Sequence, residues 1–260
     1  MKYKEFLIIG SGISGLSASF HLGHCRCIIL EKQNNPFGTL FSDNLNGFTW
    51  DQGPHVSFTK SKYVQDIFKD SVDGHFFEKE VRISNYFKGY WLDHPVQSNL
   101  YQVPEPLRSE CLASFLSGQD TQRVCIETDY GEWLRNNLGE KITETFVAPY
   151  TRKYWTTEPS QLTLDWISRR IYKPNVEEII EGSKSKLEKK THYVNSIRYP
   201  ESGGYQSFAN KLFNGSNIVK SCAATKIDLK KKLVYCENGD VYQYAKLIST
   251  MPIPDLVPLI

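Results

Sequence analysis

The feature that most constrains the fold of this chain is a glycine-rich turn near its N-terminus, between an apolar strand and a helix. Residues 6–9 (FLII) predict a buried strand, and residues 16–22 predict the first turns of a helix. The turn between them has the spacing GxGxxG and consists of Gly10, Ser11, Gly12, Ile13, Ser14 and Gly15. A second apolar strand, residues 27–30, ends at Glu31. This order predicts a βαβ unit with a dinucleotide site.

Each glycine has its own physical reason in such a unit. Gly10 permits the tight turn from strand to helix, and Gly12 leaves room for a pyrophosphate to approach the backbone. Gly15 lets the helix pack close to the sheet. Free N–H groups at the positive end of the helix then face the phosphates, and Glu31 is placed to accept hydrogen bonds from ribose hydroxyls.

Composition and charge narrow the class of protein. With 260 residues, 40% of them hydrophobic, the chain is long enough for one large domain or two smaller ones. The net charge of +2 implies no acidic polymer as partner, and the basic run over residues 184–190 is typical of a solvated helix end, so we expect no nucleic-acid binding.

No apolar stretch approaches the roughly 18 residues of a membrane span, and the apolar N-terminal run is too short for a signal peptide. The six cysteines include no CxxC pair and are expected to be free thiols, and with no signal peptide or membrane span we expect a cytoplasmic protein. We also expect that it holds no metal.

The pattern of the chain changes along its length. A strand-like hairpin over residues 81–92 precedes a mainly helical stretch, residues 104–172. The polar residues 174–194 are expected to be rich in loops, and strand character returns over residues 217–250. We therefore predict a nucleotide-binding domain in two parts with a substrate domain of a β-hairpin and helices inserted between them: residues 1–80 and 196–260 for the first, and residues 81–195 for the insert.

Two further segments follow the second strand. Residues 31–39 (EKQNNPFGT) are similar to the acid and double-glycine pattern of many FAD enzymes, in which the backbone passes the FAD pyrophosphate, although Phe37 stands at the first glycine. Residues 47–55 (GFTWDQGPH) are similar to an Asp-x-Gly-x-His segment that lies beside the isoalloxazine ring. On these residues the chain resembles the flavoprotein superfamily that contains UDP-galactopyranose mutase, protoporphyrinogen oxidase and the amine oxidases.

Five later segments extend the resemblance over nearly the whole chain and favour the mutase branch. Residues 91–99 resemble the mutase hairpin that ends in Pro-Phe-Gln-Asn-Asn, and residues 146–155 (FVAPYTRKYW) resemble the mutase Arg-Pro-Tyr and Lys-x-Trp segment. Residues 166–171, 198–204 (RYPESGG) and 249–252 follow in the family's order. Three side chains of the mutase pattern are replaced here, which removes an arginine and aromatic stacking surface: the replacements are Ala148, His94 and Val96.

The resemblance implies an α/β fold, with a Rossmann-like FAD/NAD(P)-binding domain of three layers (β/β/α) and an inserted, mainly helical substrate domain. It implies FAD as the cofactor, reduced by NAD(P)H if the chain is a mutase. Transferred residue by residue, it predicts that FAD is bound by Gly10, Ser11, Gly12, Ile13, Ser14, Gly15, Glu31, Lys32, Gly38, Thr39, Gly53, Pro54, His55, Ala224 and Thr250.

The resemblance also implies two catalytic residues, His55 and Arg170, and a set of substrate contacts. His55 lies against the flavin, where its imidazole can hydrogen-bond the flavin edge or a substrate oxygen; alternatively it is a loop histidine that caps backbone. Arg170, or the arginine before it, binds the substrate pyrophosphate with its guanidinium fork. Tyr150 stacks on a uracil and Trp155 lines the sugar pocket, or both are core aromatics. Gln97 supplies a further polar contact to the substrate.

The predicted function is that of an FAD-dependent enzyme that acts on a nucleotide sugar in cell-surface glycan biosynthesis through reduced flavin. The alternative is an FAD-dependent oxidoreductase of the protoporphyrinogen or amine oxidase type, and a third hypothesis is a truncated, catalytically incomplete subunit that binds nucleotide. The family continues well beyond Ile260, and residues 256–260 include apolar side chains without an evident local partner. We therefore expect weak FAD retention, and a homo-oligomer or another partner that covers this end.

Overall fold

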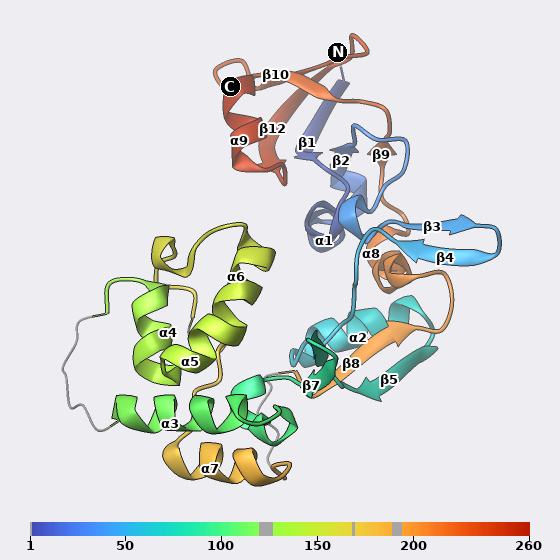
Figure 1. Ribbon diagram of the computed structural model, residues 1–260. Coiled ribbons are helices and arrows are strands. Elements are labelled where there is room, and N and C mark those ends of the chain that lie inside the picture. Colours follow the sequence, from blue (N-terminus) through green and yellow to red (C-terminus); the bar gives the residue numbers. More distant parts are fainter. Residues whose placement is uncertain (1, 120–126, 168–169, 189–193) are drawn as a thin grey trace. The chain divides into compact units, whose positions relative to one another are not determined.

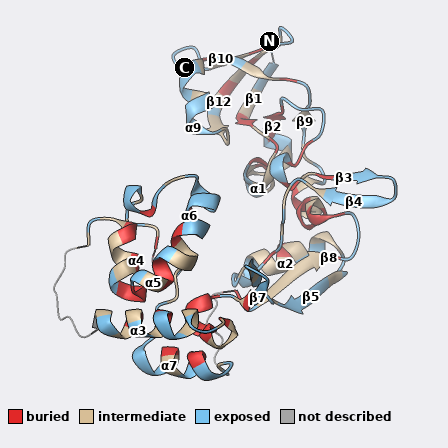
Figure 2. Ribbon diagram, viewed as in Figure 1, coloured by how far each residue is buried: buried red, intermediate tan, exposed pale blue. Residues whose placement is uncertain are grey.

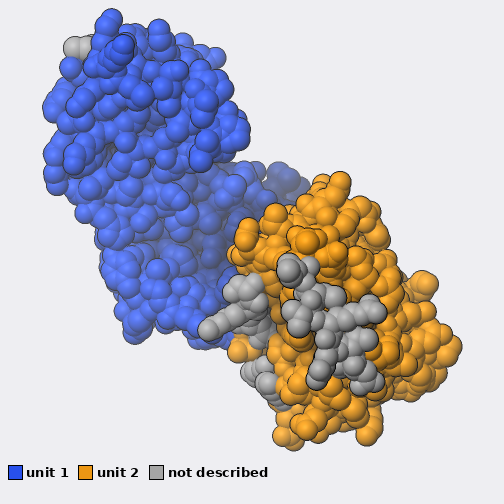
Figure 3. Space-filling model, turned by 90° about the vertical axis from the view of Figure 1, so that its left-hand side faces the viewer, with its two compact units in different colours: residues 1–79, 196–260 blue, residues 80–195 orange. Residues whose placement is uncertain are grey.

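The computed structural model describes residues 2–119, 127–167, 170–188 and 194–260. The chain forms two compact units, coloured separately in Figure 3: Met1–Lys79 with Ser196–Ile260, and Glu80–Asn195. The assignment of cofactor binding to the first unit and of substrate binding to the second stays a prediction.

The first unit is built on a six-stranded mixed sheet (Figure 1). Its parallel strands lie in the order β12 (Val241–Ser249), β1 (Lys2–Ile9), β2 (Cys27–Leu30) and β9 (Ile218–Val219), and β11 (Leu233–Cys236) and β10 (Ala224–Asp228) continue the sheet beside β12 in antiparallel orientation. Ile9 of β1 pairs with Leu30 of β2 and with Ser249 of β12. The three strands therefore end at one edge of the sheet, where parallel α/β folds bind their ligands.

Apolar residues of β1 are buried on both faces of this sheet (Figure 2). Phe6 and Ile8 belong to one core, which α1 (Ile13–Leu22), α2 (Lys62–Ser71) and α8 (Asn210–Phe213) complete. Leu7 and Ile9 belong to the core on the opposite face. This alternation follows from the period of two residues along a strand, and the continuous apolar run is typical of a strand covered on both sides. The predicted α/β class with a Rossmann-like βαβ unit is confirmed.

Two small sheets complete the first unit. β3 (Ser42–Leu45) and β4 (Phe48–Asp51) form an antiparallel hairpin, and β5 (Phe76–Glu80) pairs with β8 (Ser196–Pro200). These four strands have no strong apolar alternation, and the sequence analysis did not predict them. The β3–β4 hairpin matters for the site because it follows the segment after β2 and leads to His55.

The C-terminal residues of the first unit differ from the expectation. Leu256, in α9 (Ile253–Leu256), and Leu259 pack against the second sheet core, whereas Val257 and Ile260 are exposed. The prediction that these apolar side chains have no local partner is therefore wrong for Leu256 and Leu259. A helical turn brings residues three apart to the same side, and here that side faces the sheet.

The second unit is mainly helical. It contains the hairpin of β6 (Ser84–Phe87) and β7 (Tyr90–Asp93), followed by α3 (Leu107–Gln119), α4 (Tyr130–Leu138), α5 (Glu140–Ile142), α6 (Ala148–Trp155) and α7 (Val176–Lys184). A π-helical turn, Thr143–Val147, joins α5 to α6. The core of this unit consists of side chains from β7 and the segment after it, and from α3, α4, α5 and α7, among them Leu100, Phe115, Leu134, Ile142 and Ile179, each at most 1% exposed. None of the helices in the described part of the chain has both the length and the apolar composition needed to cross a bilayer.

Helix α7 lies inside the stretch that was predicted to be loop-rich, so that prediction is wrong. The side chain of Asn175 accepts a hydrogen bond from the N–H of Glu178 at 2.8 Å, and the Glu178 carboxylate accepts one from the N–H of Asn175 at 3.1 Å. A Cβ added at Gly182 would lie 2.6 Å from the carbonyl oxygen of Ser98, so the helix packs closely on that segment. The Asn-x-x-Glu spacing is the capping-box signal that identifies this helix in the sequence.

Candidate functional site

The glycine turn begins in a backbone conformation that L side chains rarely adopt. Gly10 has a φ of +98°, and its N–H donates to the carbonyl oxygen of Leu30 at 2.8 Å. A Cβ added to Gly10 would lie 2.4 Å from Oγ1 of Thr250, which itself donates to the carbonyl oxygen of Ile9 at 2.9 Å. Gly10 is therefore required both by the turn and by the close approach of the residue that follows β12.

Gly12 and Gly15 have opposite surroundings. A Cβ on Gly15 would lie 1.9 Å from the carbonyl oxygen of Gly10 and 3.4 Å from Cγ2 of Ile8, so α1 packs directly on the end of β1. At Gly12, the residue before α1, an added Cβ would meet none of the described atoms within 4 Å. The first N–H groups of a helix have no partner inside it. The open side of Gly12 and the positive end of α1 can therefore receive an anion such as a pyrophosphate.

Glu31 is buried at the end of β2 and binds the glycine turn. Its Oε2 accepts hydrogen bonds from the N–H of Ser11 at 2.9 Å and from Oγ of Ser11 at 2.7 Å, and its Oε1 accepts one from the N–H of Gln33 at 2.8 Å. A carboxylate can accept about four hydrogen bonds. The three that the described residues donate leave Oε1 able to accept another, as the predicted ribose contact requires.

Phe37 stands where the related pattern has its first glycine, and its backbone has the conformation that favours glycine. Its φ is +82°, and its N–H donates to the carbonyl oxygen of Ser11 at 3.0 Å. Gly38 also has a positive φ, and a Cβ there would lie 3.2 Å from Cα of Gly12. This second segment therefore passes directly against the glycine turn. The Phe37 ring packs on Phe213 with 4.8 Å between centroids, and this burial offsets a backbone cost of about 1–2 kcal/mol.

Asp51, at the end of β4, is the centre of a polar cluster. Its Oδ1 accepts hydrogen bonds from Oγ of Ser42 at 2.6 Å and from the N–H of Tyr205 at 3.1 Å, and its Oδ2 accepts one from the hydroxyl of Tyr199 at 2.7 Å. Burial alone would raise the pKa of the Asp51 carboxyl, but these hydrogen bonds, with a smaller contribution from the nearby His55, hold its pKa below the usual 3.8. Burial and the bond to Asp51 raise the pKa of Tyr199 to about 12. The cluster therefore contains a carboxylate and a neutral phenol at neutral pH.

His55 lies beside this cluster. Its ring stacks on that of Tyr205, with 5.3 Å between centroids and an interplanar angle of 21°. Its Nδ1 lies 3.1 Å from the carbonyl oxygen of Gly53, so the backbone contact of the alternative hypothesis for His55 is present. Contact between His55 and a flavin stays a prediction.

The double glycine of the later motif packs against the same hairpin. Gly203 and Gly204 have φ values of +77° and +73°. A Cβ added at Gly204 would lie 2.3 Å from Oγ of Ser42 and 2.9 Å from Cγ2 of Thr49. The sequence analysis quoted this turn and Asp51 as parts of motifs but assigned them no contact. Their common place at the hairpin is a product of the tertiary fold.

The remaining residues of the predicted cofactor set lie near the edge of the sheet at which β1, β2 and β12 end, or are exposed. Ala224 is the first residue of β10, and the N–H of the nearby Cys222 donates to the carbonyl oxygen of Glu31 at 2.8 Å. Five members of the whole set are exposed: Ser14, Lys32, Gly38, Thr39 and Pro54. The structure thus brings the glycine turn, Glu31, Gly38 and Thr250 together, and the roles of all these residues in binding stay predictions.

Two of the predicted substrate residues lie on α6 of the second unit. Tyr150 and Trp155 are 55% and 44% exposed, so the alternative that they are core aromatics does not describe their side chains. Tyr154 lies between them. Its ring stacks on that of Tyr150, with 5.8 Å between centroids, and meets that of Trp155 edge-on, with 5.1 Å between centroids. The rings of Trp155 and Trp166 also pack together, with 5.6 Å between their centroids. The helix therefore presents an aromatic surface of the kind that stacks on planar rings.

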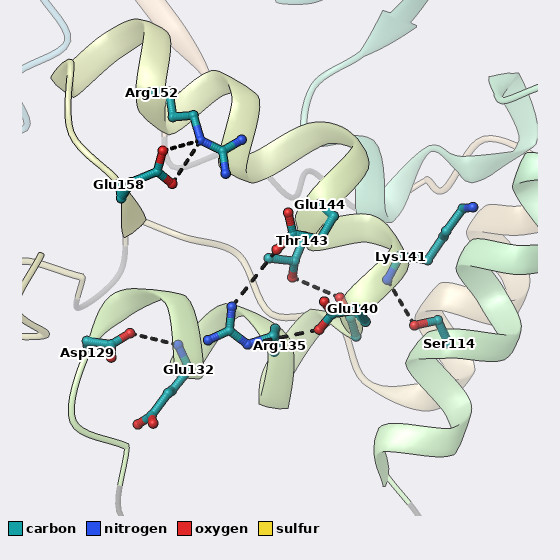
Figure 4. A network of polar contacts seen from close by, with 11 residues as sticks. Ser114, Asp129, Glu132, Arg135, Glu140, Lys141, Thr143, Glu144, Arg152 and Glu158 are labelled. Carbon is teal, nitrogen blue, oxygen red and sulfur yellow. Dashed lines mark hydrogen bonds and ion pairs between the residues drawn. The ribbon is translucent and has the colours of Figure 1, made fainter. Parts of the chain in front are cut away.

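A network of polar contacts holds α6 and its neighbours, and Figure 4 shows it from close by. Arg152 of α6 donates to both carboxylate oxygens of Glu158, at 2.7 and 2.9 Å. Arg135 of α4 lies 3.9 Å from the carboxylates of both Glu140 and Glu144. These contacts join α6 to the residues that follow it, and α4 to α5 and the π-helical turn before α6.

The other two predicted substrate residues differ in exposure. Gln97 is 5% exposed, and its Nε2 donates to the carbonyl oxygen of Tyr172 at 2.7 Å, so its amide already has a partner inside the unit. Arg170 is exposed, and its N–H donates to the carbonyl oxygen of Ile167 at 2.8 Å. Arg169, the alternative for the phosphate contact, lies outside the described residues.

Comparisons with known proteins agree with this geometry. Residues 8–71 match the protein family described as an NAD(P)-binding Rossmann-like domain. A crystal structure of reduced UDP-galactopyranose mutase superposes with a TM-score of 0.91 at 25% identity, over 98% of this chain and 57% of the mutase chain. A putrescine oxidase variant redesigned for cofactor binding superposes with a TM-score of 0.62 at 14% identity, over 100% of this chain and 60% of the oxidase, which is a likeness of fold. Chloroplastic protoporphyrinogen oxidase 1 of Arabidopsis thaliana is 22% identical over 250 residues, which are 90% of this chain and 46% of the relative.

The chain belongs to the FAD-dependent amine oxidase-like superfamily. This confirms the family that the motifs indicated. The chain spans between 46% and 60% of the length of these three members of the superfamily. The superfamily contains both mutases and oxidases. Membership therefore establishes a flavoenzyme fold and does not by itself determine the reaction.

Proposed function

We propose that this chain binds FAD across the edge of the sheet at which β1, β2 and β12 end. The observation that carries the proposal is the contrast between the glycines: Gly15 has no space for a side chain, whereas Gly12 faces open space at the positive end of α1. The remaining acceptor position of Glu31 suits a ribose hydroxyl. The segment of Phe37 and Gly38 passes directly against the glycine turn. This segment resembles the one that passes the pyrophosphate in many FAD enzymes, so it supports FAD over a nicotinamide cofactor.

We further propose that the chain is a flavoenzyme of the mutase type that acts on a nucleotide sugar. Bound FAD, once reduced, would supply the chemistry of the sugar rearrangement, which involves no net change of oxidation state, and the side chains would bind and orient the substrate. Tyr150 and Trp155 would stack on the base and line the sugar pocket, and Arg170 would hold the diphosphate. In favour of this reaction are the TM-score of 0.91 to the mutase and the exposed rings on α6. Two observations argue against this reaction. The amide of Gln97 is buried and already has a partner, and alanine stands at position 148, where the mutase pattern has arginine.

The second candidate is an FAD-dependent oxidoreductase. It is supported by the similarity to chloroplastic protoporphyrinogen oxidase 1 over 90% of this chain. In this reading the aromatic rings of α6 would contact an apolar or amine substrate in place of a nucleotide base. His55 would hydrogen-bond the cofactor edge in either reaction.

Titration of the apoprotein with FAD tests the cofactor, with flavin fluorescence and the absorbance band near about 450 nm as readouts. We expect saturable binding to the wild-type chain and none to Gly12→Val, whose branched side chain would occupy the place of the pyrophosphate. Far-UV circular dichroism and urea unfolding show whether the variant keeps the fold. Equal FAD binding by a folded Gly12→Val would overturn the cofactor site.

The two reactions are then separated with the FAD-loaded protein. After chemical reduction, interconversion of the pyranose and furanose forms of a UDP-sugar, followed by chromatography, identifies the mutase. Bleaching of oxidised flavin by an amine or a porphyrinogen, with no effect of UDP-sugars, identifies the oxidoreductase instead and contradicts the mutase proposal.

A further inference from the structure

We propose that Asp51 is a positioning residue, which ties the β3–β4 hairpin to the turn after β8 and thereby holds His55 stacked on Tyr205. The inference deepens the proposed function and rests on it, because His55 is the residue predicted to face the flavin. Asp51 itself is not assigned any contact with cofactor or substrate.

The contacts of Asp51 join segments that are far apart in the chain. Its Oδ1 accepts from Ser42, which pairs with Asp51 across the hairpin. Its two remaining partners, Tyr199 and Tyr205, follow the inserted second unit in the sequence. A second contact parallels this connection, since the N–H of Ser42 donates to Oε1 of Gln206 at 3.1 Å. The hairpin is therefore joined to β8 and to the turn after it at several points, and the carboxylate of Asp51 makes two of these hydrogen bonds.

The same turn supplies the ring on which His55 lies. Tyr205 donates its N–H to Asp51, and its ring is stacked on that of His55. The Tyr205 ring is 8% exposed and packs edge-on against Phe208 with 5.6 Å between centroids. Because Tyr205 is fixed from two sides, it can determine the orientation of the His55 ring. Asp51 thus acts on His55 through Tyr205 and through the chain between residues 51 and 55.

A carboxylate suits this position better than an uncharged group. All three partners donate a hydrogen bond to Asp51. A carboxylate has two acceptor oxygens and no donor, so it can accept all three bonds. An asparagine has only one acceptor oxygen, so its N–H group would face either the Tyr205 N–H, which cannot accept, or the Tyr199 hydroxyl, which would have to reverse its hydrogen bond. Hydrogen bonds to a charged acceptor are also roughly twice as strong as those between neutral groups.

The apoprotein provides the first test, by NMR of the His55 Cε1–H resonance, assigned from its loss in His55→Gln. In the wild-type chain this resonance is expected to carry a ring-current shift from Tyr205. Asp51→Asn should reduce that shift, and Asp51→Ala should reduce it further. Asp43→Asn is the matched control, because Asp43 is an exposed aspartate of the same hairpin that accepts a bond from the adjacent Asn44 N–H. An unchanged His55 resonance in a folded Asp51→Asn would overturn the proposal.

The FAD-loaded protein provides the second test. We expect Asp51→Asn to raise the FAD dissociation constant roughly tenfold and to alter the flavin absorbance spectrum, and Asp43→Asn to change neither. If Asp51→Ala does not fold, Tyr199→Phe, which removes one donor alone, should give a smaller shift of the same sign in the His55 resonance. Failure of the wild-type chain to bind FAD contradicts the proposed function, whereas the NMR result on the apoprotein still decides the role of Asp51.

Discussion

Both the N–H and the hydroxyl of Ser11 donate to the same carboxylate oxygen of Glu31, at 2.9 and 2.7 Å. The pair joins the glycine turn after β1 to the end of β2, and both residues are buried. The acid at the second strand therefore holds the shape of the turn in addition to its predicted contact with a ribose. Two functions at one carboxylate make substitutions of Glu31 itself difficult to interpret, and Ser11 is the better residue to change.

Ser11→Ala should lower the free energy of unfolding of the apoprotein by about 1–3 kcal/mol, because it removes a buried hydrogen bond to a charged acceptor. The N–H bond from residue 11 to Glu31 would remain. Urea unfolding followed by circular dichroism measures the change. Ser14→Ala, an exposed serine in the same turn, is the control and should leave stability within about 0.5 kcal/mol of the wild type. Equal effects of the two substitutions would contradict the assigned role of the Ser11 hydroxyl.

Gly15→Ala should destabilise the fold by about 1–3 kcal/mol or more, because its Cβ would lie 1.9 Å from the carbonyl oxygen of Gly10 and α1 would have to move away from β1. Gly12→Ala is the matched control. Its φ of −67° is ordinary for any residue, and the added Cβ meets open space among the described residues, so stability should change by less than about 1 kcal/mol. Thermal unfolding of both apoproteins separates the two glycines, and similar midpoints would mean that the packing of α1 is described wrongly.

The contribution of Asp51 to stability should depend on pH. Its pKa in the folded protein lies below 3.8, the value expected in the unfolded chain, so the unfolded state binds the proton more readily. Its contribution is therefore complete above the unfolded pKa and is lost as the pH falls through the folded pKa. Unfolding free energies measured from neutral pH down into this acid range should fall more steeply for the wild type than for Asp51→Asn. Parallel curves would contradict the hydrogen-bonded carboxylate.

Arg170→Ala should weaken UDP-sugar binding by about 1.5–3 kcal/mol if the mutase proposal is correct, since one charged hydrogen bond to the diphosphate is lost. FAD content should not change. Isothermal titration of the FAD-loaded protein with UDP measures the effect. Arg82→Ala, another exposed arginine of the second unit, should leave UDP binding unchanged. If the wild-type chain fails to bind UDP even at high concentration, the oxidoreductase proposal gains over the mutase proposal.

The cysteines should differ sharply in their reactivity. Cys25 is exposed, whereas burial raises the pKa of the Cys111 thiol to about 11, and burial together with the neighbouring Cys222 raises that of Cys236 to about 12. Because the thiolate is the reactive form, alkylation of the native protein near neutral pH should label Cys25 long before Cys111 or Cys236. Peptide mapping by mass spectrometry after timed quenching measures the order, and urea should remove the difference. Early labelling of Cys111 would show that its core is not formed.

Local sequence patterns predicted the elements whose reasons are local. The apolar run before Gly10, the glycine spacing and the acid at position 31 predicted the βαβ unit, because the conformation of a tight turn and the alternation of a buried strand are properties of neighbouring residues. The start of α4 has a local reason of the same kind, because the side chain of Asp129 accepts from the N–H of Glu132, three residues on, at 2.9 Å. The capping box before α7 carried the same kind of signal, although the polarity of the stretch outweighed it.

The sequence alone determined the superfamily, the glycine turn and the acid that follows it, because each of these depends on residues within one short segment. The tertiary structure alone decided which distant segments meet. The bonds of Asp51 to Tyr199 and Tyr205, the place of Thr250 over Gly10 and the approach of Gly38 to Gly12 join parts of the chain separated by up to 240 residues. No periodicity encodes such contacts, since they form only when the strands of one sheet bring the ends of different segments to a common edge.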